Sequence, residues 1–580
     1  MDIEKNFPKG LLRPELFIGV ISSVSANLVR INLSDAGSPS GSHFSGDRYG
    51  KGEVGELVLI EGQLSLLLGR VIDIKIPESE RQIITPTYSG KPSLSAFGNI
   101  QLLGTVAMDT LKVTAGVNSY PRLGDRVYAA ALKFVAQIPS LMNSQDDSNL
   151  TLKLGSVDIG SEGSQSGMVE IRPEKLFGRH CAILGATGGG KSWTTARIIE
   201  ECLKHKSKII LLDATGEYRD FNEDSVKHCH LGNPVEKSQN SEPCSLPPTN
   251  FQESDFIALF EPAGKVQGPK LRAAIRSLRL AKLAKSIAPD GFIKKIDQLK
   301  TQIHEFEQNS NIVALLDDPK QQFDVSKLPQ QIEQECVWPD GFKPYPNNKE
   351  KDITKWGGED GNFSHCLSLV TRISAILASP AFACVFKSQD ESFTVKLDNF
   401  FKSDAKLLRV CLSGISYEFK AREIIANVMG REFLARARNN NFQQQPVVII
   451  VDEAHNFLGR NIGSEDSAAK LDAFELIAKE GRKYGLNICL TTQRPRDITE
   501  GVLSQMGTLI VHRLTNDRDR EVVERACGEI DRTASAFLPN LKPGEAAILG
   551  ADFPIPLTIQ IKKPSVKPRS DGPNFQQAWK

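Results

Sequence analysis

Short apolar runs rich in β-branched residues follow one another closely from about residue 16 to residue 136. They lie at residues 17–21, 28–31, 57–60 and 69–74, and turns rich in Gly and Ser separate them. Many short strands at short spacing are typical of a small barrel or sandwich. We therefore expect an N-terminal β-barrel over residues 1–140, and we recognise no catalytic motif within it.

A change of pattern divides the rest of the chain. Residues 141–170 are polar and rich in Ser and Gly, and we interpret them as a linker. Over residues 171–560, apolar strands alternate with longer helical segments, which is typical of an α/β domain with a parallel sheet. Within that domain, residues 240–400 contain Pro-rich turns and helical stretches and predict a largely helical insertion. The Pro-rich tail, residues 561–580, predicts an extended arm.

The composition is that of an ordinary globular protein, with 40% hydrophobic and 24% charged residues in a chain of 580. These values exclude a disordered, collagen-like or coiled-coil chain. The 71 Lys and Arg balance 70 Asp and Glu, so any DNA contact must come from a local basic patch, or from one multiplied by oligomer symmetry. We find no long apolar run, no signal peptide and only scattered cysteines, and we expect a cytoplasmic protein with reduced thiols and no membrane span.

One segment carries a phosphate-binding motif. Residues 181–184 are apolar, and residues 185–192 read Gly-Ala-Thr-Gly-Gly-Gly-Lys-Ser before a helical pattern. The spacing matches a P-loop, in which glycines let several N–H groups converge on phosphate oxygens. We expect Lys191 to reach the β- and γ-phosphates and the Ser192 hydroxyl to ligate Mg²⁺. The predicted nucleotide-binding residues are Gly185, Thr187, Gly188, Gly189, Gly190, Lys191, Ser192 and Trp193. The alternative is an ordinary Gly-rich turn.

A second motif joins an apolar run to two acids. Residues 447–451 fit a strand buried on both faces, and Asp452 and Glu453 follow it. We expect Asp452 to hold Mg²⁺ through water and Glu453 to polarise the water that attacks the γ-phosphate. The alternative is a strand followed by an exposed acidic turn.

Two further residues are candidates for the same reaction. Gln493 follows another apolar strand, where ligands bind in open α/β sheets, and we predict a γ-phosphate sensor or else an ordinary loop. Arg482 lies at the end of an amphipathic helix that we expect to stop at Gly485. Arg482 either complements the helix dipole or acts as an arginine finger in a neighbouring subunit.

The order of these motifs resembles that of a known family. After the P-loop come Asp-Ala-Thr-Gly-Glu-Tyr at residues 213–218, Asp-Glu-Ala-His-Asn at 452–456, Glu-Gly-Arg-Lys at 480–483 and Gln-Arg-Pro at 493–495. Ser-Gln at 504–505, Arg-Leu-Thr-Asn at 513–516 and Pro-Gly-Glu-Ala at 543–546 continue the series. Over about residues 170–560 the chain resembles the HerA branch of the HerA/FtsK ATPases. The strand-rich start resembles the β-barrel that precedes the HerA core.

The resemblance implies a RecA-like P-loop core in a homohexamer, with ATP and Mg²⁺ bound between subunits and double-stranded DNA in the central pore. It implies that hydrolysis drives translocation, with Glu453 as catalytic base, and that Arg482 acts in trans. It also implies an effector partner, a nuclease such as NurA in archaea or a sirtuin-like protein in bacterial antiphage defence. We expect the bacterial branch. Two features depart from the family pattern: the long insertion, and Ala-Thr at residues 214–215 where Pro-His is expected. They bear on which branch of the family the chain resembles and on which partner it works with.

Two segments are candidates for DNA contact. A predicted helix carries cations near helical spacing, and they form either a solvated face or a surface for DNA phosphates: Lys270, Arg272, Arg276, Arg279, Lys282 and Lys285. The loop at residues 459–463 would suit a pore loop. The run His228-Cys229-His230 does not have the spacing of a metal site.

Three functions compete at this point. The first is an ATP-driven DNA translocase or helicase motor. The second is an ATP-regulated hexameric scaffold that recruits and activates an effector enzyme without processive movement. The third, a conjugation-type coupling ATPase, would require membrane helices, which the sequence does not predict.

Overall fold

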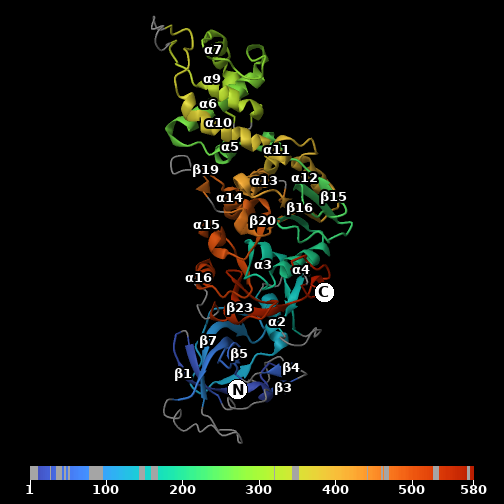
Figure 1. Ribbon diagram of the computed structural model, residues 1–580. Coiled ribbons are helices and arrows are strands. Elements are labelled where there is room, and N and C mark those ends of the chain that lie inside the picture. Colours follow the sequence, from blue (N-terminus) through green and yellow to red (C-terminus); the bar gives the residue numbers. More distant parts are fainter. Residues whose placement is uncertain are drawn as a thin grey trace. The chain divides into compact units, whose positions relative to one another are not determined.

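Two compact units make up the computed structural model, and each is described by itself (Figure 1). Unit 1 contains Met1–His205, Thr491–Arg496 and Leu503–Lys567, and unit 2 contains Lys206–Leu490, Asp497–Val502 and Pro568–Lys580. The structure describes residues 11–26, 28–33, 42–44, 47–49, 52–77, 96–142, 150–157, 167–318, 321–341, 352–439, 442–458, 461–462, 469–526, 535–570, 572 and 575–579.

The first part of unit 1 is a closed antiparallel barrel, which confirms the predicted architecture. Its strands are β1 (Phe17–Val24), β2 (Leu28–Leu33), β5 (Leu57–Ile60), β6 (Ser65–Lys75), β7 (Ala96–Ala107) and β9 (Arg126–Ala129). They run in the order β2-β1-β9-β5-β6-β7, and pairing of β2 with β7 closes the ring. Along β2, Val29, Ile31 and Leu33 are buried while the residues between them are exposed, so one face of each strand fills the barrel core. The short strand β8 (Val113–Ala115) pairs antiparallel with β7, and β3 (Ser42–Phe44) pairs with β4 (Asp47–Tyr49).

The second part of unit 1 is a mixed sheet. Its strand order is β11 (Met168–Ile171), β10 (Leu152–Ser156), β23 (Phe553–Ile561), β22 (Glu545–Gly550), β21 (Thr508–Val511) and β12 (Cys181–Leu184). The pair β12–β21 is parallel, whereas β21–β22 and β22–β23 are antiparallel. A short turn joins β22 to β23, while α16 lies in the connection from β21 to β22. The predicted linker contains β10 and β11, since alternate residues such as Leu152 and Leu154 are buried. The helices of unit 1 are α2 (Leu132–Leu141), α3 (Pro173–Phe177), α4 (Lys191–Leu203) and α16 (Asp517–Ala526).

Unit 2 contains the parallel sheet that the sequence predicts. The strand order is β20 (Leu486–Thr492), β17 (Val447–Val451), β13 (Lys208–Asp213), β16 (Leu407–Gly414), β14 (Val226–Gly232) and β15 (Ser241–Pro243), and every pairing between these neighbours is parallel. Every residue of β13 is buried, as expected for a strand covered on both faces. The helices α13 (Ala421–Arg438) and α14 (Ala473–Glu480) and the short strands β18 (Asn461–Ile462) and β19 (Ala469–Lys470) accompany the sheet.

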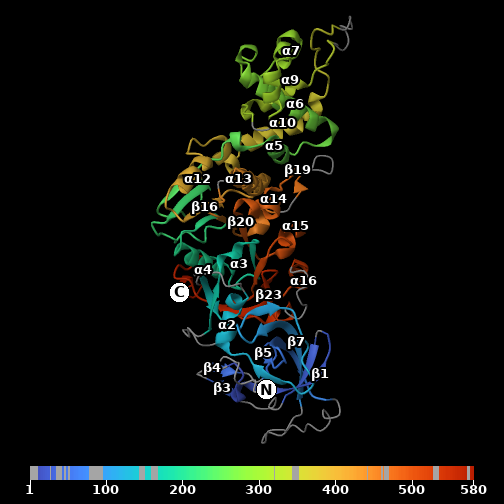
Figure 2. The ribbon, with the colours of Figure 1, turned by 180° about the vertical axis from the view of Figure 1, so that it is seen from behind.

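The chain between β15 and β16 is mainly helical (Figure 2). Its helices are α5 (Glu253–Phe260), α6 (Gly264–Leu283), α7 (Thr301–Glu307), α8 (Ser310–Leu316), α9 (Leu328–Glu335), α10 (Phe363–Ala378), α11 (Ala383–Phe386) and α12 (Phe393–Lys402). Two short helices, α15 (Glu500–Leu503) and α18 (Phe575–Ala578), lie near the end of the chain. In the described part of the chain no single helix has the length and apolarity to cross a membrane, although Phe363–Ala378 and Pro380–Phe386, bent by 63°, pass that test as a pair.

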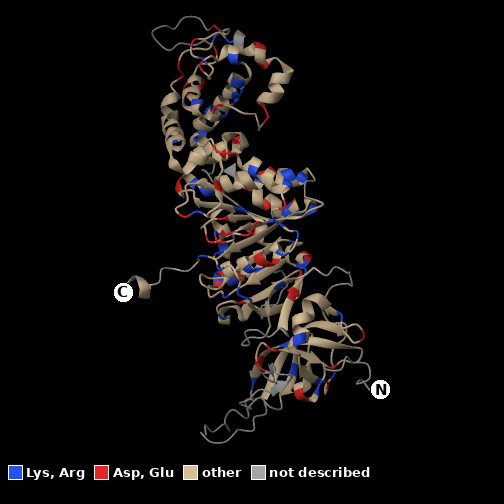
Figure 3. Cartoon of the chain, turned by 90° about the vertical axis from the view of Figure 1, so that its right-hand side faces the viewer, with Lys and Arg blue, Asp and Glu red and all other residues tan. Residues whose placement is uncertain are grey.

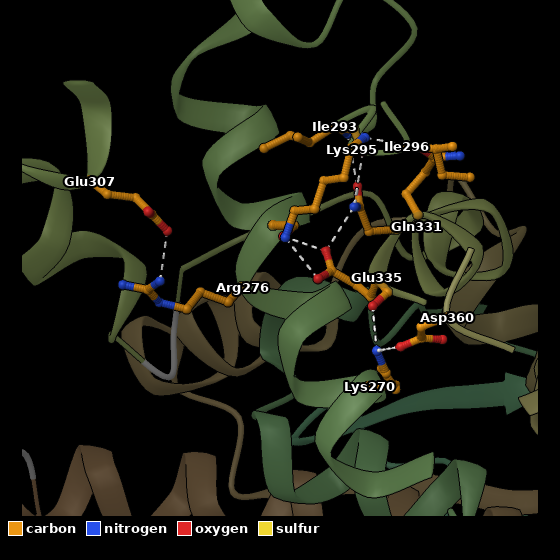
Figure 4. A network of polar contacts seen from close by, with 11 residues as sticks. Lys270, Arg276, Ile293, Lys295, Ile296, Glu307, Gln331, Glu335 and Asp360 are labelled. Atoms are coloured by element: carbon orange, nitrogen blue, oxygen red, sulfur yellow. Dashed lines mark hydrogen bonds and ion pairs between the residues drawn. The ribbon is translucent and has the colours of Figure 1, made fainter. Parts of the chain in front are cut away.

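Acidic and basic residues are interspersed in the helical insertion (Figure 3). Lys270 Nζ lies 3.0 Å from Asp360, and Arg276 Nη1 lies 2.9 Å from Glu307 (Figure 4). Arg279 is only 4% exposed. Lys270 and Arg279 are therefore engaged in the packing of the insertion and do not belong to a solvated face. The Arg276 side chain is 43% exposed, and Arg272, Lys282 and Lys285 are also exposed, so a solvated face and a surface for DNA phosphates stay predictions for these residues.

A second network of the insertion surrounds Glu335 (Figure 4). Its carboxylate accepts hydrogen bonds from Lys295 Nζ at 2.7 Å, Ser277 Oγ at 2.6 Å and Gln331 Nε2 at 2.9 Å. Lys295 Nζ also lies 5.0 Å from the centre of the Trp356 ring. The buried charges of the insertion are thus paired within it, as buried ions must be.

The cysteines behave as the sequence predicts. Those in the described residues are all buried and free of disulfide bonds. Burial raises the pKa of Cys336 to about 12, so this thiol stays protonated and unreactive.

Candidate nucleotide-binding site

The phosphate-binding loop joins a buried strand to a helix. β12 is buried at every position, and α4 begins directly after Gly190. Gly188 and Gly190 have φ angles of +75° and +116°, which residues with a Cβ rarely adopt. A Cβ on Gly190 would also lie 3.2 Å from Gly544 Cα. The glycines therefore allow a backbone turn that other residues resist.

Lys191 and its neighbours occupy the start of α4. Lys191 is 8% exposed, and its Nζ donates a hydrogen bond of 3.2 Å to Ala186 O within the loop. Ser192 and Trp193 are partly exposed, while Thr187 and Gly188 are exposed at the rim. An ammonium group, a hydroxyl and the positive end of a 13-residue helix thus gather at one turn, which fits the phosphates of a nucleotide and a magnesium ion.

Gln493 lies beside this loop. It follows β20, and its Oε1 accepts a hydrogen bond of 2.5 Å from Thr187 Oγ1. The fold therefore brings together two predicted site residues that are 306 positions apart in the sequence. The role of Gln493 as a γ-phosphate sensor stays a prediction.

Asp452 and Glu453 follow the end of β17 in unit 2. Asp452 is 4% exposed and accepts a hydrogen bond of 3.5 Å from the Tyr218 hydroxyl. Glu453 has a φ of +46°, which is uncommon for a residue other than glycine and represents strain of the kind found at functional sites. Glu453 Oε2 lies 3.2 Å from His455 Nδ1. The backbone thus turns sharply at the residue that we predict to be the base.

Asp213 organises the second motif of unit 2. Its carboxylate accepts hydrogen bonds from the backbone N–H groups of Gly216 at 2.7 Å, Glu217 at 3.2 Å and Tyr218 at 3.2 Å. These bonds hold the turn after β13, and the Tyr218 side chain then reaches Asp452. Asp213 therefore stabilises the backbone turn of this motif, although the motif has Ala-Thr at residues 214–215 where Pro-His is expected.

The sequence analysis missed the buried cation behind this turn. Arg409 Nε lies 2.7 Å from Asp213 Oδ2, and the two side chains are 1% and 0% exposed. His228 Nε2 lies 2.7 Å from Phe221 O, and burial, with the charge of Arg409 adding to it, lowers the pKa of His228. The one available signal was a charged residue inside the otherwise apolar β16. The described residues contain no cluster of three or more His, Cys, Asp or Glu that could hold a metal ion.

Arg482 is exposed on the 3₁₀ turn Gly481–Tyr484, which directly follows α14. Gly485 ends the turn with a φ of +76°, as predicted for a helix stop. Exposure is a requirement for action on a neighbouring subunit, and that role stays a prediction. The predicted pore loop is only partly covered, since residues 459, 460 and 463 lie outside the described residues.

Comparison with known proteins adds an independent finding. A family model described as the central domain of the helicase HerA matches residues 154–335. The probable DNA double-strand break repair helicase HerA of Methanocaldococcus jannaschii is 26% identical over 73% of this chain and 81% of its own length. The DNA double-strand break repair helicase HerA of Sulfolobus acidocaldarius is 25% identical over 86% of this chain and 89% of its own length. A solved structure of the bacterial conjugative coupling protein TrwB covers 76% of this chain and 95% of its own with 13% identity and a TM-score of 0.43, a likeness too distant to bear on function.

Proposed function

We propose that the chain is a HerA-type P-loop ATPase and that it is an ATP-driven motor that moves double-stranded DNA through a homohexameric ring. The observation that carries the proposal is the P-loop with Lys191 inside it and Gln493 bonded to Thr187 at its rim. Relatives named as DNA double-strand break repair helicases, one of them matching 86% of this chain, support DNA as the substrate.

The proposed reaction divides among a few side chains. The loop N–H groups and Lys191 bind the phosphates of ATP, and Gln493 senses the terminal one. Ser192, and Asp452 through water, would hold Mg²⁺, which when bound offsets negative charge on the β- and γ-phosphate oxygens. Glu453 accepts the proton of the attacking water, a role that contributes about 10²–10⁴ in rate.

We further propose that the motor works beside a separate effector. A nuclease or a sirtuin-like protein, acting in DNA end processing or antiphage defence in the cytoplasm, is the expected partner. The support is the double-strand break repair role in the names of the relatives. A stable complex between the purified chain and the protein encoded beside its gene is the expected result.

The central experiment measures ATP turnover with and without duplex DNA. We expect DNA to stimulate the wild-type chain and Glu453→Gln to bind ATP while turning over about 10²-fold more slowly or less. Near-normal turnover by Glu453→Gln would remove Glu453 as the base. Absence of stimulation by DNA, with ATP-dependent effector binding intact, would replace the motor by the regulated scaffold.

A mixing experiment tests the shared site. Arg482→Ala and Lys191→Ala are each expected to be nearly inactive as pure rings. If Arg482 acts on a neighbouring subunit, mixed rings contain junctions where an intact P-loop meets an intact Arg482, and activity returns. Mixed rings no more active than the two pure variants would exclude action of Arg482 on a neighbouring subunit, and near-normal turnover by pure Arg482→Ala rings would place Arg482 outside the reaction.

A further inference from the structure

A buried histidine lies beneath the phosphate-binding loop. His512 directly follows β21 and is fully buried, at 0% exposure. A Cβ on Gly185 would lie 2.6 Å from His512 Cβ, and a Cβ on Gly190 would lie 3.2 Å from His512 Cε1. A side chain at Gly185 would thus collide with His512, and one at Gly190 would press tightly against its ring.

The ring of His512 is fixed by a hydrogen bond at each nitrogen. Nδ1 lies 2.8 Å from Glu545 O, and because a carbonyl can only accept, Nδ1 carries the proton. Nε2 lies 2.8 Å from Thr194 Oγ1 and accepts from that hydroxyl. Burial lowers the pKa of His512 to about 4, and the charge of Lys191 adds to the effect. The imidazole is therefore neutral, in one tautomer, between α4 and β22.

The turn before β22 supports the loop from the same side. Gly544 N donates a hydrogen bond of 3.1 Å to Gly189 O, and Glu545, the next residue, is the one that accepts from His512. A loop that binds phosphate needs its N–H groups directed at the ligand, so its carbonyl groups need donors elsewhere. The Pro-Gly-Glu-Ala motif at residues 543–546 thus has a physical role next to the P-loop.

We propose that His512 is a positioning residue for nucleotide binding, which holds the P-loop and the start of α4 in the shape that receives phosphate. Its side chain is fully buried, and it acts through Thr194 on one side and through the Gly544–Glu545 turn on the other. The inference rests on the proposed function in one respect, since the ligand is taken to be the diphosphate of an adenine nucleotide at residues 185–192.

The test measures ADP affinity of the full-length chain with a fluorescent ADP analogue, together with the unliganded melting temperature. We expect His512→Leu, which removes both ring hydrogen bonds, to weaken ADP binding about tenfold or more, and Thr194→Val, which removes one, to weaken it about threefold. His512→Asn keeps a donor near Nδ1 and His512→Gln keeps an acceptor near Nε2, so each should restore part of the affinity. The double variant Thr194→Val/His512→Leu should bind no more weakly than His512→Leu alone.

A matched control is a buried histidine that belongs to unit 2. His230 is 3% exposed, and its Nδ1 lies 2.9 Å from Ser241 Oγ. His230→Asn should leave ADP affinity unchanged, even if it lowers the melting temperature. Loss of melting temperature in His512→Leu with unchanged ADP affinity would overturn the proposal, and so would additive effects of Thr194→Val and His512→Leu.

The readout also separates this proposal from the proposed function. ADP binding needs neither hydrolysis nor DNA. A wild-type chain that binds ADP but shows no DNA-stimulated turnover would refute the motor, whereas the ratio of affinities between the variants would still decide the role of His512.

Discussion

The buried ion pair between Arg409 and Asp213 makes a sharp prediction about stability. The two side chains are 1% and 0% exposed, and four donors surround the carboxylate. Removing one member of a buried pair costs about 3–5 kcal/mol, because the remaining charge is left without compensation. Where the loss of stability falls within this range depends on which hydrogen-bonding groups remain around the unpaired charge.

The two single substitutions leave different remainders. In Arg409→Met, Asp213 keeps three backbone N–H donors, at 2.7, 3.2 and 3.2 Å, so we expect a loss near 3 kcal/mol. In Asp213→Asn, Arg409 keeps its charge beside a His228 nitrogen 3.5 Å away, and its Nη2 has no hydrogen-bond partner among the described residues. We expect a loss near 5 kcal/mol there. The double variant should lose less than the sum, since both charges are gone together.

Urea unfolding, monitored by tryptophan fluorescence, provides the assay, because three of the four tryptophans, Trp338, Trp356 and Trp579, belong to unit 2. Arg409→Met within about 1 kcal/mol of the wild type would refute the reasoning, since it would mean that the pair contributes little beyond its hydrogen bonds. A larger loss for Arg409→Met than for Asp213→Asn would refute the argument from the remaining donors.

Three further outcomes are expected. Gln493→Ala should keep ADP affinity close to the wild-type value and lower kcat about 10²-fold, measured by steady-state turnover. The pKa of His512 is lowered to about 4 from an ordinary 6.5, so the unfolded chain binds a proton that the folded chain does not. Stability should therefore fall as the pH drops from 6.5 toward 4, by up to about 3 kcal/mol, and unfolding of His512→Gln across the same pH range should show a smaller loss. Glu335→Gln leaves Lys295 without its carboxylate and should destabilise the insertion by about 3 kcal/mol, visible in Trp356 fluorescence, with ADP affinity unchanged.

Local patterns predicted much of this molecule. Alternating or continuous apolar runs mark β1, β2, β5 and β6 of the barrel and β17, and the P-loop was readable because its glycines, Lys191 and Ser192 lie within eight consecutive residues. These features depend on neighbours along the chain, which a sequence displays directly.

The features that escaped prediction depend on distant parts of the chain. Arg409 and Asp213 are 196 positions apart, and His512 lies 318 positions from the Thr194 that it contacts. The cations of α6 show helical spacing, yet the spacing does not reveal that Asp360 and Glu307 pack against them. Charge and periodicity thus indicated which residues share a face of the helix, whereas the exposure of that face to solvent depends on the packing of distant segments.

The closed ring of the N-terminal barrel restricts how another molecule can attach to it. Each of its six strands is hydrogen-bonded to a neighbour on both sides, because β2 pairs with β7. Among these six strands an incoming peptide therefore finds no open edge for β-augmentation, and the free edge in the described part of this sheet belongs to the three-residue strand β8, which pairs with β7. Away from β8, recognition of the barrel depends on its outward-facing side chains and its connecting loops, so substitutions that alter binding there are expected to act through side-chain chemistry.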